Sequence, residues 1–355
     1  MKNKGWILLL FLSVFLANTC FAMGEAPPAT EEEKFKGTEI DLTKPSSVVS
    51  NLVKITKENE NVFPKCSSDG RLVYQARVGE DENFNIFVSA GKGFSMVTND
   101  SHNNQYPTFL GKDKIVFDSD RLNNVKLWKI SVSGKGGIGQ LTSGSSTDLM
   151  PDVSADGKNI AYCSFRKTIR KELTITELGA RWKILEEIPS VWTVDVDGKN
   201  LTQFGEGIKP AWSPDGKRIA FYRKTGDNFH IWIMDEDGGN LTQFTSGKFD
   251  AIEPAWSPDG KKIAFVSNSA GNYDVWSQNI DGADLTQLTI HDGYDGAPAW
   301  SRDGKYIYFH SYRGGNWNIW RMELIREEPV KKVIEIIKEE VKEEVIEKPE
   351  EKVAE

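Results

Sequence analysis

Cysteine and long apolar runs are scarce in this 355-residue sequence, and it has no net positive charge. Three cysteines are too few to hold the chain together as a disulfide scaffold. The formal charge of −8 offers little attraction to nucleic acid or to an anionic membrane surface. The most apolar stretch, residues 6–16, is too short to span a bilayer comfortably. The composition therefore argues against a disulfide-rich, nucleic-acid-binding or transmembrane protein.

The first 22 residues have the features of a secretory signal. Two lysines give a basic start, the apolar stretch follows, and smaller residues lead to Ala22. Cleavage after Ala22 predicts a periplasmic or secreted chain. The alternative is a lipid anchor at Cys20, which is less favoured because residues 17–19 form a poor lipoprotein box.

One phrase recurs six times along the rest of the chain. Residues 210–217 read Pro-Ala-Trp-Ser-Pro-Asp-Gly-Lys, and close copies begin at Pro254 and Pro298. Weaker copies begin at three earlier prolines, Pro64, Pro107 and Pro151. Successive prolines are 43, 44, 59, 44 and 44 residues apart. This period is typical of a β-propeller blade, with one insertion in the third copy.

Each copy contains four short strand signals. Asp-Gly pairs separate the first strand from the second and the third from the fourth, and they suit tight turns because glycine adopts a positive φ freely. The third strand carries an aromatic residue in every copy. We expect these rings to pack between blades together with the strand-one residues Trp212, Trp256 and Trp300, each contributing about 2–3 kcal/mol. The strand-three aromatics are Phe87, Trp128, Trp192, Trp232, Trp276 and Trp320.

The sixth copy ends near Leu324 without a fourth strand. Residues 51–56 resemble the fourth strand at 240–245, so residues 48–56 are predicted to complete blade six and close the ring. The prediction is an all-β fold, a six-bladed β-propeller with four-stranded blades. The predicted segments are a signal peptide (1–22), a linker (23–46), the propeller (47–325) and a charged tail (326–355).

The repeated phrase and a later Leu-Thr-Gln resemble the repeat of TolB and its WD-repeat-like relatives over about residues 48–325. This resemblance implies a protein-binding or scaffolding module of the cell envelope, whose partner is an envelope protein or peptide, and not an enzyme. TolB also has an α/β domain before its propeller and works in the Tol–Pal system. Only about 25 residues separate Ala22 from the closing strand, too few for that domain, so its role is not carried over.

Strand parity divides the loops between two faces. The first face carries the segments that lead into strand one and the loops between strands two and three, whereas the Asp-Gly turns lie on the opposite face. A polar residue precedes each strand-one proline and is expected to ring the channel mouth on the first face. These residues are Asn61, Asn104, Asp148, Glu206, Asp250 and Asp295. They suggest either a site for a cation or a basic partner, or side chains that begin a turn.

The insertion in blade three, residues 166–190, is the largest departure from the repeat. It opens with Arg166, Lys167, Arg170 and Lys171 and continues into an alternating segment that predicts an extra β-hairpin. We regard Arg166 and Arg170 as candidate partner contacts, because insertions often carry protein-specific binding. The alternative is a tolerated surface insertion.

Catalytic chemistry has little support in the sequence. No Gly-x-Ser-x-Gly motif occurs, and Cys66 and Cys163 are interpreted as core residues. Only His102 and His291, among four histidines, lie in segments between blades. Because propeller-type polysaccharide lyases use a histidine-rich metal site, this pair leaves a metal-dependent carbohydrate-active enzyme as the alternative function. No cofactor is otherwise expected, apart from structural calcium in the channel.

The tail after Arg326 is rich in glutamate, lysine, valine and isoleucine. Its apolar residues fall at helical spacing, which is compatible with an amphipathic helix that binds a partner or self-associates. The alternative is a charged, partly disordered tail, because a short helix rich in β-branched residues is marginal by itself. The helical positions are Val330, Val333, Ile334, Ile337, Val341 and Val345.

Overall fold

The computed structural model describes residues 49–90, 93–122, 124–168, 172–176, 179–183 and 186–325. The predicted signal peptide, linker and tail lie outside these ranges, as does Arg170, and the side chains of residues 167–187 are likewise not described. The described part of the chain contains strands and turns and no helix. The described residues therefore include no helix that is long and apolar enough to cross a membrane.

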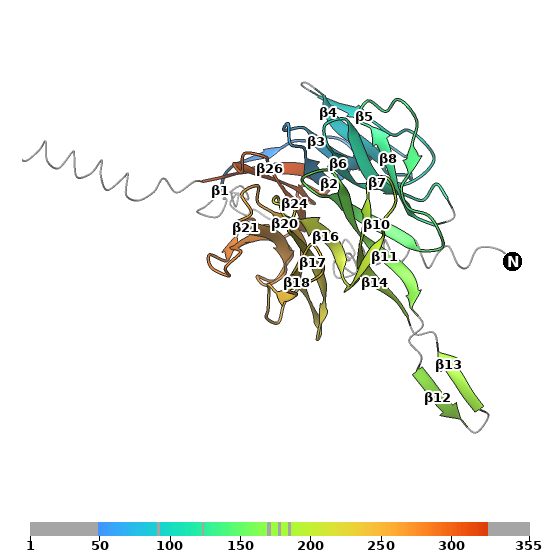
Figure 1. Ribbon diagram of the computed structural model, residues 1–355. Coiled ribbons are helices and arrows are strands. Elements are labelled where there is room, and N and C mark those ends of the chain that lie inside the picture. Colours follow the sequence, from blue (N-terminus) through green and yellow to red (C-terminus); the bar gives the residue numbers. More distant parts are fainter. Residues whose placement is uncertain are drawn as a thin grey trace, which may run out of the picture. The chain divides into compact units, whose positions relative to one another are not determined.

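Six four-stranded antiparallel sheets form the blades of a β-propeller (Figure 1). Blades one and two are β2 (Glu60–Cys66), β3 (Leu72–Arg77), β4 (Asn85–Ala90), β5 (Gly93–Met96), β6 (Asn104–Leu110), β7 (Lys114–Ser119), β8 (Lys126–Ser131) and β9 (Gly139–Gln140). Blades three and four are β10 (Thr147–Val153), β11 (Asn159–Thr168), β14 (Glu186–Asp195), β15 (Thr202–Glu206), β16 (Ile208–Trp212), β17 (Arg218–Thr225), β18 (Asn228–Asp235) and β19 (Thr242–Gln243). Blade five is β20 (Ala251–Trp256), β21 (Lys262–Ser267), β22 (Asp274–Asn279) and β23 (Thr286–Gln287).

Blade six confirms the predicted closure of the ring. Its first three strands are β24 (Asp295–Trp300), β25 (Tyr306–Ser311) and β26 (Asn318–Leu324), and its fourth is β1 (Val49–Lys54). β1 pairs antiparallel with β26, with Val49 opposite Leu324. The N-terminal strand thus covers the edge that β26 would otherwise expose.

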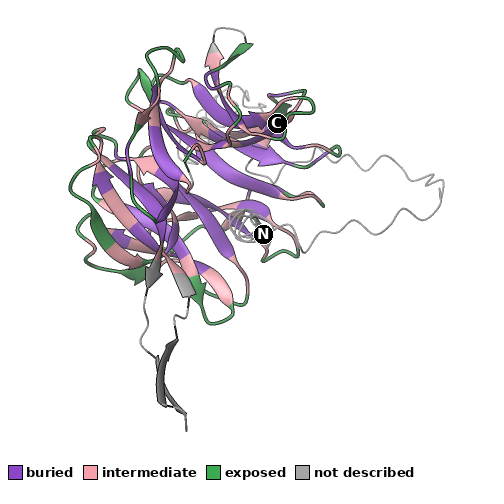
Figure 2. Ribbon diagram, turned by 90° about the vertical axis from the view of Figure 1, so that its right-hand side faces the viewer, coloured by how far each residue is buried: buried purple, intermediate pink, exposed green. Residues whose placement is uncertain are grey.

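The core lies along the strands, whereas exposed residues gather in the loops (Figure 2). The most completely buried ring of each blade belongs to strand two, an aromatic position that is not among the sequence predictions above. These rings are at most 4% exposed, so they pack the blades more completely than most of the half-buried strand-three aromatics. These strand-two residues are Tyr74, Phe117, Tyr162, Phe221, Phe265 and Phe309.

The blade-three insertion contains the predicted hairpin. β12 (Glu172–Thr176) and β13 (Gly179–Lys183) form a separate two-stranded antiparallel sheet between the long strands β11 and β14. The alternating segment pairs as expected, with Leu173 opposite Trp182 and Ile175 opposite Ala180.

The turns between strands one and two of blades three to six share one hydrogen-bonding pattern. In blade five, the Ser257 hydroxyl donates to the Asp259 carboxylate at 2.7 Å, and the Lys261 N–H donates to the same oxygen at 3.1 Å. Gly260 takes a φ of 68°, which glycine adopts without strain. The sequence Ser-Pro-Asp-Gly-Lys therefore uses its aspartate to build the turn.

Candidate functional site

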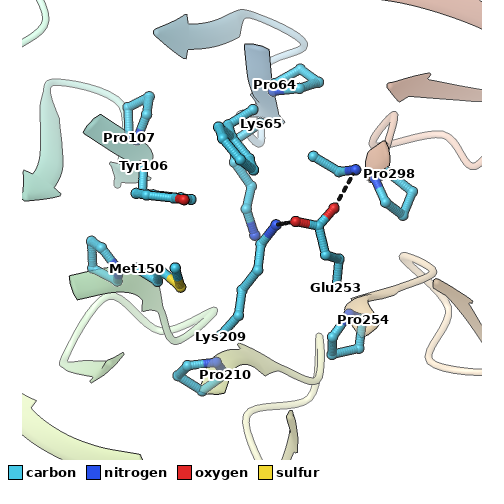
Figure 3. A pocket seen from close by; sticks show the side chains of 13 residues that line it. Pro64, Lys65, Tyr106, Pro107, Met150, Lys209, Pro210, Glu253, Pro254 and Pro298 are labelled. Atoms are coloured by element: carbon cyan, nitrogen blue, oxygen red, sulfur yellow. Dashed lines mark hydrogen bonds and ion pairs between the residues drawn. The ribbon is translucent and has the colours of Figure 1, made fainter. Parts of the chain in front are cut away.

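A β-bulge interrupts strand one of every blade immediately before its proline. The strand-one register shifts there, and the residue before the proline adopts a left-handed φ between 48° and 57°. A non-glycine residue pays on the order of 1 kcal/mol for that conformation. The bulge re-aims each of these side chains into the central channel (Figure 3). The six residues are Phe63, Tyr106, Met150, Lys209, Glu253 and Ala297.

Side chains of the preceding blade satisfy several of the N–H groups that the bulges free. A residue of strand two supplies the acceptor in three cases, so neighbouring blades are joined next to the channel. The acceptors are His310 Nδ1 for Phe63 (3.2 Å), Gln75 Oε1 for Tyr106 (2.6 Å) and Asp118 Oδ2 for Met150 (2.8 Å). Burial lowers the pKa of His310 to about 4, which keeps its imidazole neutral and able to accept.

Blade five uses a different acceptor, a channel-facing side chain, and this side chain helps to fill the channel. Its strand two has Val266 at the acceptor position, and the Glu253 carboxylate accepts the Ala297 N–H instead, at 2.6 Å. The other Glu253 oxygen lies 2.7 Å from Lys209 Nζ. That ammonium also lies 4.7 Å from the centre of the Phe63 ring, on blade one. Lys209 and Glu253 therefore form a bridge between neighbouring blades inside the channel (Figure 3).

The bridge is electrostatically well matched. Burial alone would raise the pKa of Glu253, but the Lys209 ammonium and the Ala297 N–H outweigh it and hold that pKa below its ordinary value. The space left among the six channel-facing side chains and their prolines is about 30 Å³, enough for little more than a water molecule. We call this layer the axial plug, defined by Phe63, Tyr106, Met150, Lys209, Glu253 and Ala297.

A much larger cavity of about 380 Å³ lies on the other side of the axial plug. Lys65 and Pro298 line both spaces, so the plug forms the floor of this cavity. Its rim is made by turns between strands one and two, including the exposed residues Ser68, Ala155 and Arg302. We call it the funnel, and the side on which it opens, which carries the Asp-Gly turns, the turn face.

Four aromatic side chains contribute to the funnel wall. Trp212, Trp256 and Trp300 come from three consecutive blades, and Phe109 lies on blade two. The indole N–H groups of Trp256 and Trp300 donate to strand-one carbonyls of the preceding blade at 3.1 Å, which fixes both rings. Rigid, partly covered aromatic rings around a hollow are typical of binding sites.

The funnel floor contains one ion pair. Lys65 Nζ lies 2.8 Å from Asp152, whose second oxygen accepts the Trp212 N–H at 2.8 Å. Cys66 also lines the funnel, but burial raises the pKa of its thiol to about 12, so it is a poor nucleophile. Cys163 is fully buried, in keeping with its interpretation as a core residue.

The polar residues predicted to ring the first-face mouth do not line the axial plug or the funnel. Asn61, Asn104, Asp148 and Asp295 lie three residues before their prolines and donate their backbone N–H groups to the preceding blade at 2.8–3.0 Å. Their side chains consequently lie buried between blades. The bulge, which the sequence did not reveal, explains the difference, because it directs another residue of the segment into the channel.

Ion pairs and hydrogen bonds, within a blade and between blades, occupy these side chains. Asp148 accepts from Lys126 Nζ at 3.0 Å and from Ser164 at 2.7 Å, and both members of the ion pair are at most 2% exposed. Asp295 accepts from Arg313 at 2.6 Å. Asn104 is bonded to Arg121 and Asp100.

The remaining predicted site residues are scattered. Asp250 is half-buried and accepts the Phe229 N–H and the Tyr273 hydroxyl at 2.8 Å each, whereas Glu206 is exposed at the end of outer strand β15. Arg166 stacks over the Trp192 ring of its own blade, 3.5 Å from its centre.

His102 and His291 lie in separate loops. His102 lies between blades one and two, and His291 lies between blades five and six. Among the described residues, the structure contains no group of three or more His, Cys, Asp or Glu side chains arranged to hold a metal ion. The His291 ring accepts the Gly293 N–H at 2.8 Å, and His102 lies 3.4 Å from Asp100.

A family match and the fold of solved structures agree with the repeat. Residues 189–335 match the TolB beta propeller domain family. TolB from Acinetobacter baumannii is 20% identical, with a TM-score of 0.57 over 76% of this chain and 64% of that protein. This chain thus spans 64% of the length of that relative.

Two enzymes share the fold at lower identity. Oligogalacturonate lyase from Vibrio parahaemolyticus is 13% identical, with a TM-score of 0.52 over 80% of this chain and 96% of that one. A gluconolactonase from Xanthomonas campestris is 14% identical, with a TM-score of 0.55 over 78% of this chain and 89% of that one. No curated protein sequence matches the chain. The six four-stranded blades and the family match together show that the chain carries a TolB-like β-propeller.

Proposed function

We propose that this chain is an exported TolB-like propeller that binds an envelope protein or peptide through the funnel on the turn face. It acts as a binding or scaffolding module and performs no chemistry on its partner. The N-terminal 22 residues support export, because their basic start and apolar stretch are typical of a secretory signal. The propeller is expected to work in the periplasm or outside the cell.

The observation that carries this proposal is the contrast between the two cavities of the channel. The axial plug leaves about 30 Å³, whereas the funnel offers about 380 Å³. A volume of that size accepts a few side chains of a polypeptide but not a folded domain. Its tryptophans provide apolar edges, of which Trp300 is the most exposed, and the ion pair of Lys65 and Asp152 provides polar contacts that orient a ligand.

The funnel suits an inserted segment better than a flat docking partner. Pro258 and Arg302 project from neighbouring turns on its rim, and Ser68 and Ala155 lie on the rim at other blades. A partner that reaches the tryptophans must therefore pass between turns of several blades. A loop or terminal segment of an envelope protein meets this requirement.

A cross-linking pull-down from intact envelopes tests the proposal. The bait is the full chain, compared with the variants Ala155→Trp and Ala270→Trp. Ala155 is exposed on the funnel rim, so an indole there obstructs the cavity, whereas Ala270 is equally exposed on the first face. A Ser68→Trp variant obstructs the funnel from another blade and guards against a local effect at position 155. All variants are first checked by thermal unfolding.

We expect wild type and the Ala270→Trp variant to capture the same discrete envelope protein. Both funnel variants should lose it while keeping the wild-type melting temperature. Capture that survives both funnel substitutions and is lost with Ala270→Trp would assign the partner to the first face and overturn the proposal. An absence of any captured protein would count against a scaffolding role.

A further inference from the structure

The turn face carries exposed lysines in the turns between strands one and two, and several of these turns form the funnel rim. In most turns between strands one and two, the aspartate is held by a serine hydroxyl and a backbone N–H. The lysine that follows the glycine is exposed in four of these turns. We call these residues the lysine ring: Lys158, Lys217, Lys261 and Lys305.

Positive charge outweighs negative charge in these inner turns. Across the six inner turns there are ten lysines and arginines and six aspartates, a formal surplus of four positive charges in residues 69–71, 112–114, 156–158, 215–218, 259–262 and 302–305. The turns between strands three and four, which lie farther out, are acidic in blades four and five. Asp235, Glu236 and Asp237 belong to one, and Asp281 and Asp284 to the other. An anionic segment is therefore favoured at the funnel and disfavoured toward the periphery of these blades.

The chain itself continues from this face. Strand parity directs β26 from the first face toward the turn face, and its last residue, Leu324, donates its N–H to the carbonyl of Lys305 at 2.8 Å. The tail thus begins next to a member of the lysine ring. Residues 327–355 contain eleven glutamates and six lysines, a formal charge of −5. They also contain valines and isoleucines at helical spacing, from Val330 to Val345.

We propose that the acidic tail of this chain, residues 327–355, docks on its own turn face, with its glutamates on the lysine ring and its apolar residues against the funnel tryptophans. Two complementary features support this occupant, since the tail pairs negative charge with apolar side chains and the face pairs positive charge with aromatic ones. The connection is short as well, because a few extended residues at about 3.3 Å each lead from Leu324 to the rim.

Tethering makes weak contacts sufficient. A segment joined to the surface that it binds acts at an effective concentration in the millimolar range. Individual surface ion pairs contribute only about 0.2–1 kcal/mol. The tail therefore occupies the funnel when no other ligand is present, held by several such ion pairs and by the burial of valine or isoleucine side chains. The inference goes beyond the proposed function, because it holds whether or not an envelope protein also uses the funnel.

Photo-cross-linking of the purified full chain tests the docking. A photoreactive benzoylphenylalanine replaces Ala155 on the funnel rim, and a matched chain carries it at Ala270 on the first face. After irradiation and proteolysis, mass spectrometry locates the attached peptide. We expect the probe at position 155 to attach to residues 327–355, and the probe at position 270 to attach there several-fold less often.

Charge reversal supplies the second arm. In the chain with the probe at position 155, the combined changes Lys217→Glu, Lys261→Glu and Lys305→Glu should lower attachment to the tail several-fold. The matched control reverses three exposed lysines of the first face, Lys57, Lys224 and Lys248, and should leave attachment unchanged. Raising the salt from 0.1 to 1 M shortens the screening length from about 10 to about 3 Å and should weaken attachment in the same direction.

Mixing isotope-labelled and unlabelled chains distinguishes docking of a chain's own tail from docking of the tail of a second copy. Docking within one chain gives attached peptides of a single isotopic composition, which supports the proposal. Mixed species would identify the tail of a second copy and overturn it. Equal attachment from positions 155 and 270, or attachment that ignores the reversal of the lysine ring, would also overturn it. Because this assay uses no envelope protein, its result is independent of the pull-down.

Discussion

The two faces of the propeller use similar polar residues for different purposes. On the first face, Asp148 and Asp295 are buried; Asp148 pairs with Lys126 of the preceding blade, and Asp295 pairs with Arg313 of its own blade. On the turn face, Asp156 and Asp303 build their own turns and remain exposed at the surface. The first face consequently leads onto a channel that the axial plug fills, and the turn face opens into the funnel.

The difference teaches that position within a blade decides what an acidic residue does. Strand one is the innermost strand, so a residue at its start lies between two blades and is desolvated. A buried carboxylate requires a partner there, and Lys126 and Arg313 provide it. A carboxylate in a turn keeps its water and needs only local donors, which leaves the centre of the turn face free for a ligand.

The largest expected effect is the loss of a buried partner on the first face. Asp148→Ala leaves the Lys126 ammonium, which is 2% exposed, without its counter-charge. We expect this variant to lose about 3–5 kcal/mol of unfolding free energy. The matched change Asp156→Ala, on the turn face of the same blade, should cost about 1 kcal/mol or less. Urea unfolding of both variants measures the comparison, and similar losses would remove the distinction between the faces.

The axial plug should show a smaller effect that depends on pH. Lys209→Met leaves Glu253 buried without its cation, and we expect a loss of about 2–3 kcal/mol at pH 7. In wild type the lowered pKa of Glu253 contributes stability above its ordinary pKa of 4.5, which is lost as the pH falls. The difference in unfolding free energy between the variant and wild type should therefore become smaller toward pH 4. Adding Glu253→Gln should recover most of the loss, and a difference independent of pH would contradict the bridge.

A third prediction concerns two neighbouring carboxyl groups of the first face. Burial and the nearby Asp295 raise the pKa of Asp274 from 3.8 to about 7. The pKa of Asp274 is higher in the folded than in the unfolded chain. Its contribution to the free energy of unfolding is therefore complete below pH 4 and is lost as the pH rises to 7. Asp274→Asn should match wild type near pH 4 and be more stable by about 1–2 kcal/mol above pH 7.

The turn face supplies the opposite control for that prediction. The Ser301 hydroxyl and the Lys305 N–H lower the pKa of Asp303, so its contribution is present above the ordinary pKa and disappears in acid. Asp303→Asn should thus lose a little stability at pH 7 and none at low pH. Thermal unfolding across the pH range distinguishes the two. If Asp274→Asn were less stable than wild type at every pH, the two carboxyl groups would not repel each other.

The smallest expected effects are on the lysine ring. Lys217→Gln, Lys261→Gln and Lys305→Gln should each change the unfolding free energy by less than about 0.5 kcal/mol, since these side chains are exposed. A loss above 1 kcal/mol in any of them would mean that the ring supports the fold and is not a free surface.

Most of the fold could be predicted from the sequence because each blade repeats the same phrase. The spacing of the prolines indicated six blades, and the likeness of residues 51–56 to strand four indicated the closing strand, which β1 confirms. The hairpin in the insertion followed from the alternation at 173–176. These features depend on local pattern and on the need to cover strand edges.

The site was less predictable because a bulge changes which residue faces the channel. The residue before a proline favours an extended conformation, so nothing in the sequence suggested a positive φ at Phe63 or Glu253. A signal was nonetheless present. The position before the proline changes from Phe63 to Tyr106, Met150 and Lys209 while the proline itself is kept, which is typical of a position facing an asymmetric channel.

The most direct test of the account measures stability and partner capture in the same two variants. Asp148→Ala and Ala155→Trp are purified, unfolded in urea and used as bait at a temperature where both are folded. The account predicts that Asp148→Ala loses stability but captures the partner, whereas Ala155→Trp keeps its stability and captures nothing. The reverse outcome, with capture lost only in Asp148→Ala, would place the working surface on the first face and contradict the account.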